Sequence, residues 1–168
     1  MITVKTRNII EMAYGFSAMG RVFEGGAQRQ ILQRFEALMD EINADNVLSL
    51  HEEFISWFQD TIKTARRKRS SYGQAAKVAD IMLKVCVSYC RLPTPEEAER
   101  IVPKIYGAVD NLVLDHCMRR TGLGGLTREL YLEVQARLEA ESAGMPLCEY
   151  DDILWRKLVE KTRQNRSL

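Results

Sequence analysis

Apolar residues recur at spacings of three and four along most of the chain, which is typical of helices with one buried face. The apolar stripe from Ile31 to Ile42 predicts one such helix. Beyond it, Ser49 and Glu52 form a capping box that predicts a long helix from about residue 50 to residue 69. We therefore predict an all-α fold, a bundle of about five to seven helices.

The segment from about residue 72 to residue 90 is predicted to be the central, mostly buried helix of the bundle. Ser71 and Gln74 form the capping box at its start, and most residues of the segment are apolar. Its polar residues share one narrow stripe, formed by Lys77, Asp80, Lys84 and Ser88. We interpret this stripe as a solvated ribbon in which Asp80 pairs with both lysines, and the alternative is one wall of a polar groove.

Shorter helices are predicted in the second half of the chain. One begins at the N-cap and N1 pair Thr94 and Pro95, and another extends from about Ile105. Two more are predicted near the C-terminus, separated by Gly144 and Pro146. At 168 residues the whole chain (1–168) is expected to be a single helical domain. Residues 1–25, which carry internal glycines, are expected to be less regular, with a broken helix.

Composition and charge narrow the class of protein. Hydrophobic residues make up 46% of the chain and the formal net charge is only +1, so no global field draws the protein to nucleic acid or to an anionic membrane. Any such binding must be local. No stretch approaches the ~20 apolar residues that a membrane span needs, and the N-terminus carries charges where a signal peptide would be apolar. We expect a cytoplasmic protein that does not bind a membrane.

The four cysteines are expected to be free thiols. Cys86 and Cys90 lie one helical turn apart, and His116 with Cys117 would complete four zinc ligands. Adjacent helical residues diverge by about 100°, however, so His116 and Cys117 do not easily face one ion. Because cysteine is among the residue types most often buried, the sequence predicts reduced core thiols, no metal and no other cofactor.

The stretch ARRKRSSYGQAAK, residues 65–77, gathers basic side chains beside two serines. A basic helix end and the free N–H groups of the next helix would meet there, an arrangement that suits a phosphate. The candidate residues for binding an anion or nucleic acid are Arg66, Arg67, Arg69, Ser70, Ser71 and Lys77. The alternative is a plain helix junction, in which the basic residues complement the dipole of their own helix and Ser71 only caps.

Catalytic motifs are incomplete in this sequence. His51 is expected in an exposed first helical turn, and neither it nor His116 sits in a nucleophile motif. Arg69 continues the apolar stripe of its helix, so an inward guanidinium would need Asp80 or Asp110 as a partner. These two acids are also the residues that a nuclease or other enzyme would use.

Three segments resemble, in order, a family of uncharacterised bacterial helical proteins. They are SYGQAAKVADIMLKVCVSYCRLP, AVDNLVL and YLEVQARLEAESAGMPLCEYDDILW, and they cover roughly the last hundred residues. The first contains the family's GxAxK pattern at Gly73 to Lys77, the second its Asp at Asp110, and the third its tryptophan at Trp155. The proline that precedes the Asp in the family is missing here. The resemblance implies an all-α fold and brings no established activity.

Three functions are consistent with these observations. The first is a non-enzymatic helical module that binds another protein through the edge of the central helix and the C-terminal helix. The alternative is a module that binds nucleic acid or phosphate at the basic junction of residues 63–77. A nuclease or other enzyme is the third.

Overall fold

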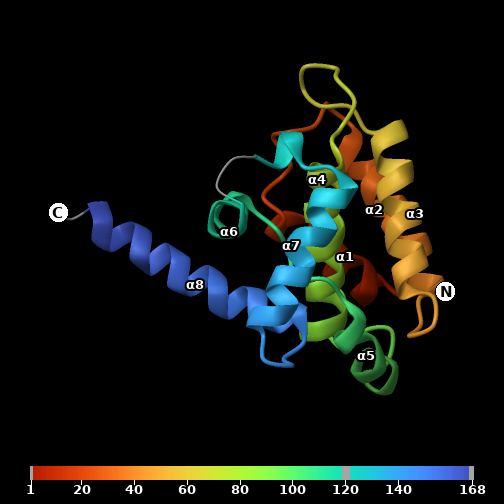
Figure 1. Cartoon of the computed structure of the whole chain (residues 1–168). Helices are drawn as coiled ribbons and strands as arrows, with labels where there is room; N and C mark the ends of the chain where they lie inside the picture. The colour runs from red at the N-terminus through yellow and green to blue at the C-terminus, as the bar shows by residue number, and fades with distance from the viewer. Residues whose placement is uncertain (1, 119–121, 167–168) are drawn as a thin grey trace.

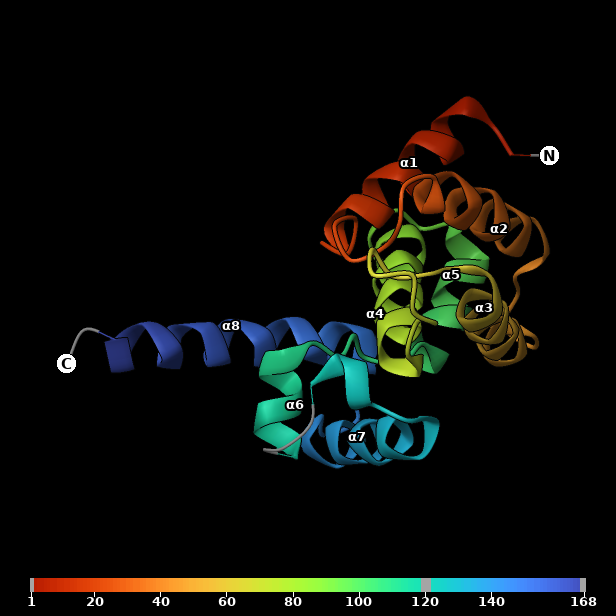
Figure 2. The same ribbon diagram turned by 90° about the horizontal axis from the view of Figure 1, so that it is seen from above.

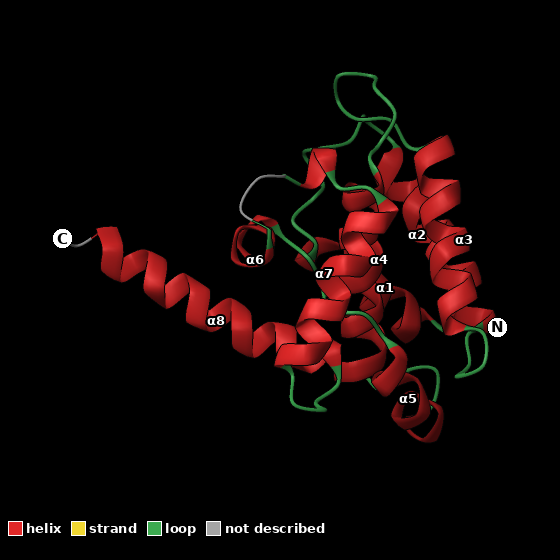
Figure 3. Cartoon of the chain, viewed as in Figure 1, coloured by secondary structure: helices red, strands yellow, loops and turns green. Residues whose placement is uncertain are grey.

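The computed structural model describes residues 2–118 and 122–166, which contain eight α-helices and no β-strand. The predicted all-α bundle is thus confirmed, with one α-helix more in these ranges than the upper end of the predicted five to seven (Figures 1 and 3). The α-helices are α1 (Val4–Phe16), α2 (Ala27–Glu41), α3 (Val47–Thr61), α4 (Tyr72–Leu83), α5 (Pro95–Ile101), α6 (Asn111–Cys117), α7 (Arg128–Glu141) and α8 (Leu147–Arg166). None of the helices in these described ranges is both long and apolar enough to cross a membrane.

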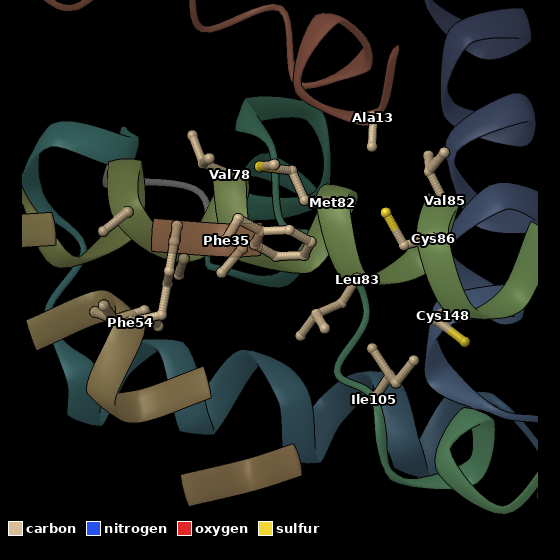
Figure 4. Close-up of a cluster of buried hydrophobic side chains, with 14 of the residues drawn as sticks. Ala13, Phe35, Phe54, Val78, Met82, Leu83, Val85, Cys86, Ile105 and Cys148 are labelled. Atoms are coloured by element: carbon tan, nitrogen blue, oxygen red, sulfur yellow. The ribbon is translucent and has the colours of Figure 1, made fainter. Parts of the chain in front are cut away.

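The predicted central helix is also confirmed. It consists of α4 and a π-helical continuation, η1 (Lys84–Tyr89), and it packs against α1, α3 and α7 (Figure 1). Most of its side chains are buried, as expected for a helix covered on several sides. Figure 4 shows part of this core, in which α2, α3 and α8 contribute Phe35, Phe54 and Cys148 to the cluster that contains Met82.

The long helix predicted from residue 50 to residue 69 is wrong at its C-terminal end. Helix α3 ends at Thr61, and residues 62–71 form a loop held by two isolated β-bridges, Lys63 with Arg69 and Phe23 with Thr64. The apolar stripe of α3 stops at Ile62, which is fully buried, and the basic residues after it have no apolar face to bury. The buried Ser70 hydroxyl donates to the Ile62 carbonyl and fixes the loop at its base.

The N-terminal segment is more regular than expected. Helix α1 runs unbroken from Val4 to Phe16, and irregular structure is confined to residues 17–26, where Ala18 and Gly26 have positive φ angles. Helix α6 in turn is shorter than expected and begins at Asn111. Upstream of it, the Gln135 amide of α7 is bonded to both the N–H and the C=O of Gly107, so this backbone is not available for helical hydrogen bonds.

The C-terminal helix α8 extends away from the rest of the molecule in both views (Figures 1 and 2). Its first half packs on α6, on α7 and on the π-helical segment η1. Cys148 and Leu154 are buried there, whereas Lys157 and Lys161, later in the helix, are exposed. The anchored half of α8 therefore forms a wall beside the central helix.

A close backbone approach explains the glycine in the first turn of α4. The predicted capping box is present, since Ser71 and Gln74 each bond the backbone of the other. A Cβ atom on Gly73 would lie 2.5 Å from the Leu123 carbonyl oxygen and 2.7 Å from the Leu126 Cβ atom. Only glycine at this position lets the 3-10 turn η3 (Leu123–Gly125) pack on α4.

We expect Gly73→Ala to lower the free energy of unfolding by about 1–3 kcal/mol, the usual cost of overpacking, because the turn must move off α4. Chemical denaturation measures this change. Gly15→Ala is the matched control: it lies in α1 with nothing within 4 Å of its Cβ position, so it should be stabilising by about 0.5–1 kcal/mol. Equal effects of the two substitutions would contradict the packing role of Gly73.

Candidate functional site

A groove of about 510 Å³ lies between the end of α1, the central helix and the first half of α8. We call it the aromatic groove. Its side chains come from segments that are distant in sequence: Phe16, Ser17, Ala18, Lys77, Ile81, Lys84, Val85, Tyr89, Ala108, Val109, Asp110, Asp151, Asp152, Trp155 and Arg156. The elements around it are the central helix and the C-terminal helix, the two on which the sequence-based hypothesis of a protein-binding module depends.

Three large aromatic side chains of this groove are exposed. The relative exposure is 63% for Phe16, 53% for Tyr89 and 46% for Trp155, and each comes from a different helical segment. Single exposed apolar residues are normal on a protein surface, but a concave cluster of them marks a binding site. The three rings therefore distinguish the aromatic groove from the rest of the described surface.

The floor of the groove is a buried ion pair. The Lys84 ammonium lies 2.7 Å from Asp151 Oδ1 and 2.9 Å from Asp152 Oδ1, and Lys84 is only 8% exposed. The Ala108 N–H donates to the second oxygen of Asp151, and the Tyr89 hydroxyl donates to Asp152. These bonds connect α8 to the central helix and to the segment before α6.

Burial and charge shift the pKa values of this pair. Burial raises the pKa of Asp151 to about 7, although the charge and hydrogen bond of Lys84 oppose the rise. Burial lowers the pKa of Lys84, but the charges and hydrogen bonds of Asp151 and Asp152 together outweigh it, so this pKa is above its ordinary value. Lys84 thus remains charged and serves as the counter-ion that lets Asp151 ionise in the core.

Among the residues that the structure describes, the charged side chains of the aromatic groove that have no partner are all positive. Its acids are all engaged: Asp151 and Asp152 hold Lys84, and Asp110 caps α6 while it accepts a 3.0 Å hydrogen bond from the Trp155 indole N–H. Within the described residues, the side chains of Lys77 and Arg156 make no hydrogen bond or ion pair. These two cations are therefore available to a ligand.

The predicted stripe of Lys77, Asp80 and Lys84 lies partly in the aromatic groove and partly in the core. Lys77 and Lys84 line the aromatic groove, as in the alternative interpretation of one groove wall. The solvated ribbon is wrong, because Asp80 is fully buried and pairs with neither lysine. Three residues turn a helix by about 300°, so Asp80 lies about 60° from Lys77 and faces the core.

Asp80 belongs to a buried polar cluster. Its carboxylate is 2.8 Å from His51 Nε2 and accepts the Tyr131 hydroxyl at 2.9 Å. Burial raises the pKa of Asp80, while the bonds to His51 and Tyr131 oppose this rise. The expectation of an exposed His51 is wrong, since this side chain is 2% exposed and its ring lies 5.3 Å from that of Tyr106. Asp80 and Asp110, the acids considered for an enzyme, do not share a groove.

The basic loop contributes a second groove, of about 420 Å³, which we call the basic groove. Four cations line it, namely Arg21, Arg66, Lys68 and Arg69, together with Ser71 and Gln74. Of the residues predicted to bind an anion, the structure thus brings together Arg66, Arg69 and Ser71. Arg67 is exposed in the turn and does not line this groove, Ser70 is buried, and Lys77 lines the aromatic groove. Lys68 belongs to the basic run of the sequence but was not among the candidate residues, and Arg21 was not predicted at all.

Two details of the basic groove differ from the sequence-based expectation. Arg69 does not reach Asp80 or Asp110; it bonds Asp60 at 2.6 Å, and both side chains are exposed. The start of α4 is occupied by protein groups: the Gly73 N–H donates to the Leu126 carbonyl, the Gln74 N–H to Ser71 Oγ, and the Ser71 hydroxyl to the Leu123 carbonyl. Any anion held here therefore meets side-chain cations.

The four cysteines are free in the structure. Cys86 and Cys148 are buried, and Cys90 and Cys117 are partly buried. Burial raises the pKa of Cys148 to about 12, so this thiol stays protonated at neutral pH. Residues 2–118 and 122–166 contain no group of three or more His, Cys, Asp or Glu side chains arranged to hold a metal ion.

Comparison of the chain with protein-family models, with curated proteins and with solved structures returns no match in any of the three. The resemblance to a bacterial helical family therefore gains no support from these comparisons. The function has to be inferred from the geometry of the two grooves.

We expect Lys84→Met to lower the free energy of unfolding by about 3–5 kcal/mol at pH 8, because it leaves the Asp151 carboxylate buried without its counter-ion. The loss should shrink as the pH falls. Without Lys84 the pKa of Asp151 rises further above its ordinary value, and protonated Asp151, which needs no counter-ion, stabilises the folded state below that pKa.

Urea denaturation of the variant and the wild type at pH 8 and at about pH 5 measures this difference. Lys157→Met removes an exposed lysine from the same region and should leave stability unchanged within about 0.5 kcal/mol. A loss for Lys84→Met that is the same at both pH values would show that the substitution acts only through packing.

Proposed function

We propose that this protein is a non-enzymatic, cytoplasmic protein-interaction module that binds an acidic, apolar segment of another protein in the aromatic groove. One observation carries the proposal: the only side chains of this groove with unused charge among the described residues are the cations Lys77 and Arg156, and they stand among three exposed aromatic rings. The partner that complements such a surface carries carboxylates beside leucine, methionine or aromatic side chains.

The composition of the groove favours a peptide segment as the ligand. Aromatic rings supply a large contact area at a low entropic cost, and Trp, Tyr and Arg are the residues that dominate binding energy at protein interfaces. Trp155 and Tyr89 are held by hydrogen bonds to Asp110 and Asp152, so their rings are positioned before a partner arrives. A preorganised surface loses less entropy on binding.

The hydrogen bonds and the burial of the acidic side chains in the aromatic groove favour binding over catalysis. Asp110, Asp151 and Asp152 each hold a structural hydrogen bond, and Asp151 is 2% exposed, which keeps it from reaching a substrate. A general acid or base must come within hydrogen-bond distance of the reacting group. The groove instead offers rings and unpaired cations at its surface.

Selection from a displayed peptide library tests this function. We expect wild-type protein to enrich sequences that combine Asp or Glu with apolar residues. The double variant Lys77→Glu, Arg156→Glu should bind the selected peptides at least about tenfold more weakly, a loss of about 1.4 kcal/mol or more, because like charges then meet. Trp155→Ala should also weaken binding, without any change in charge preference.

Lys157→Glu with Lys161→Glu is the matched control, since it makes the same change in net charge at positions of α8 that do not line the groove. This control should bind the peptides as the wild type does. Enrichment of basic or uncharged peptides by the wild type, or equal losses in both double variants, would refute the proposal.

A further inference from the structure

In the described parts of the chain, the basic groove and the aromatic groove have no charged residue in common. The basic groove therefore indicates a second ligand. We infer that it binds phosphate groups, and that the ligand that supplies them is the backbone of a nucleic acid. The inference rests on three cations, Arg21, Arg66 and Lys68, which are unpaired within the described residues and which a structured loop holds around one concavity.

Backbone hydrogen bonds fix the loop of residues 62–71, which carries Arg66 and Lys68, against the segment that carries Arg21. The Ala65 N–H donates to the Val22 carbonyl at 2.8 Å, and the Glu24 N–H donates to the Lys63 carbonyl at 3.0 Å. Within the loop, the Thr64 N–H donates to the Lys68 carbonyl at 2.9 Å, and Thr64 Oγ1 accepts the Lys68 N–H. The two chain segments are thereby joined, and Arg21 is brought to the side of Arg66.

The charge of this groove is uncompensated. Arg69 is paired with Asp60, but Arg21, Arg66 and Lys68 form no ion pair within the parts of the chain that the structure describes. Among these same parts, no acidic residue lines the groove. The positive charge is therefore local to this groove, since the formal net charge of the chain is only +1, and the mutual repulsion of these cations is relieved when an anion binds.

The lining of the groove indicates which part of a nucleic acid it meets. None of the described lining residues is aromatic, so bases have no ring on which to stack. Arginine, lysine and the polar side chains of Thr64, Ser71 and Gln74 are the groups that contact phosphate oxygens. A single small phosphate binds weakly to exposed cations. A polyanion can contact all three cations of the groove at once, and it releases condensed counter-ions when it binds. Binding should therefore be independent of base sequence.

Fluorescence anisotropy with a short labelled DNA duplex, measured between about 50 and 200 mM salt, tests the inference. Three phosphate contacts predict a slope of about −2.7 for the logarithm of the association constant against the logarithm of salt concentration. The double variant Arg66→Ala, Lys68→Ala keeps Arg21 and should reduce the slope to about −0.9. Its thermal unfolding midpoint should match that of the wild type, since both side chains are exposed.

Lys157→Ala with Lys161→Ala is the matched control, because it removes the same charge from α8 and should leave the slope at its wild-type value. Competition with inorganic phosphate distinguishes the source of the phosphate groups: at equal phosphate concentration it should displace little of the duplex. The inference is overturned if the wild type does not bind the duplex at low salt, if the control loses affinity as the loop variant does, or if inorganic phosphate competes fully.

Discussion

Two ionisable side chains lie buried on the central helix, and the packing of the bundle depends on giving each of them a partner. Asp80 is satisfied by His51 from α3 and Tyr131 from α7, and Lys84 by two consecutive acids at the start of α8. An unpaired buried charge costs several kcal/mol, so a packing that fails to supply these partners is strongly disfavoured. Hydrophobic burial drives the collapse, and the partners of these two side chains come from three of the helices that pack on the central one.

Local rules accounted for much of the fold. The capping box at Ser71 and Gln74 predicted the start of α4, and Thr94 with Pro95 predicted that of α5, because a cap depends only on residues a few positions apart. The end of α3 escaped the same reasoning. A basic run is compatible with a helix by propensity, and what stops it here is pairing with residues 22–24, about forty positions away along the chain.

The candidate sites were predicted only where their residues are close in sequence. Lys77 and Lys84 were recognised as one stripe because they share a helix, and Arg66 and Arg69 as one group because they belong to one short basic run. The convergence of Phe16, Tyr89 and Trp155 depends on three separate segments and on the π-helical turns that place Tyr89 against Asp152. The burial of Asp80 was missed for a similar reason, since its partners lie 29 residues before it and 51 residues after it.

The short irregular segment after α1 is shared by both grooves. Phe16, Ser17 and Ala18 line the aromatic groove, and Arg21 and Val22 line the basic groove only a few residues later. If both proposed ligands bind, a displacement of this segment by one ligand would also move the wall of the other groove. Thermodynamic linkage then requires reciprocity: whatever factor a peptide applies to the affinity for phosphate, phosphate applies to the affinity for the peptide. The two proposed ligands would thus be coupled through a segment of only a few residues.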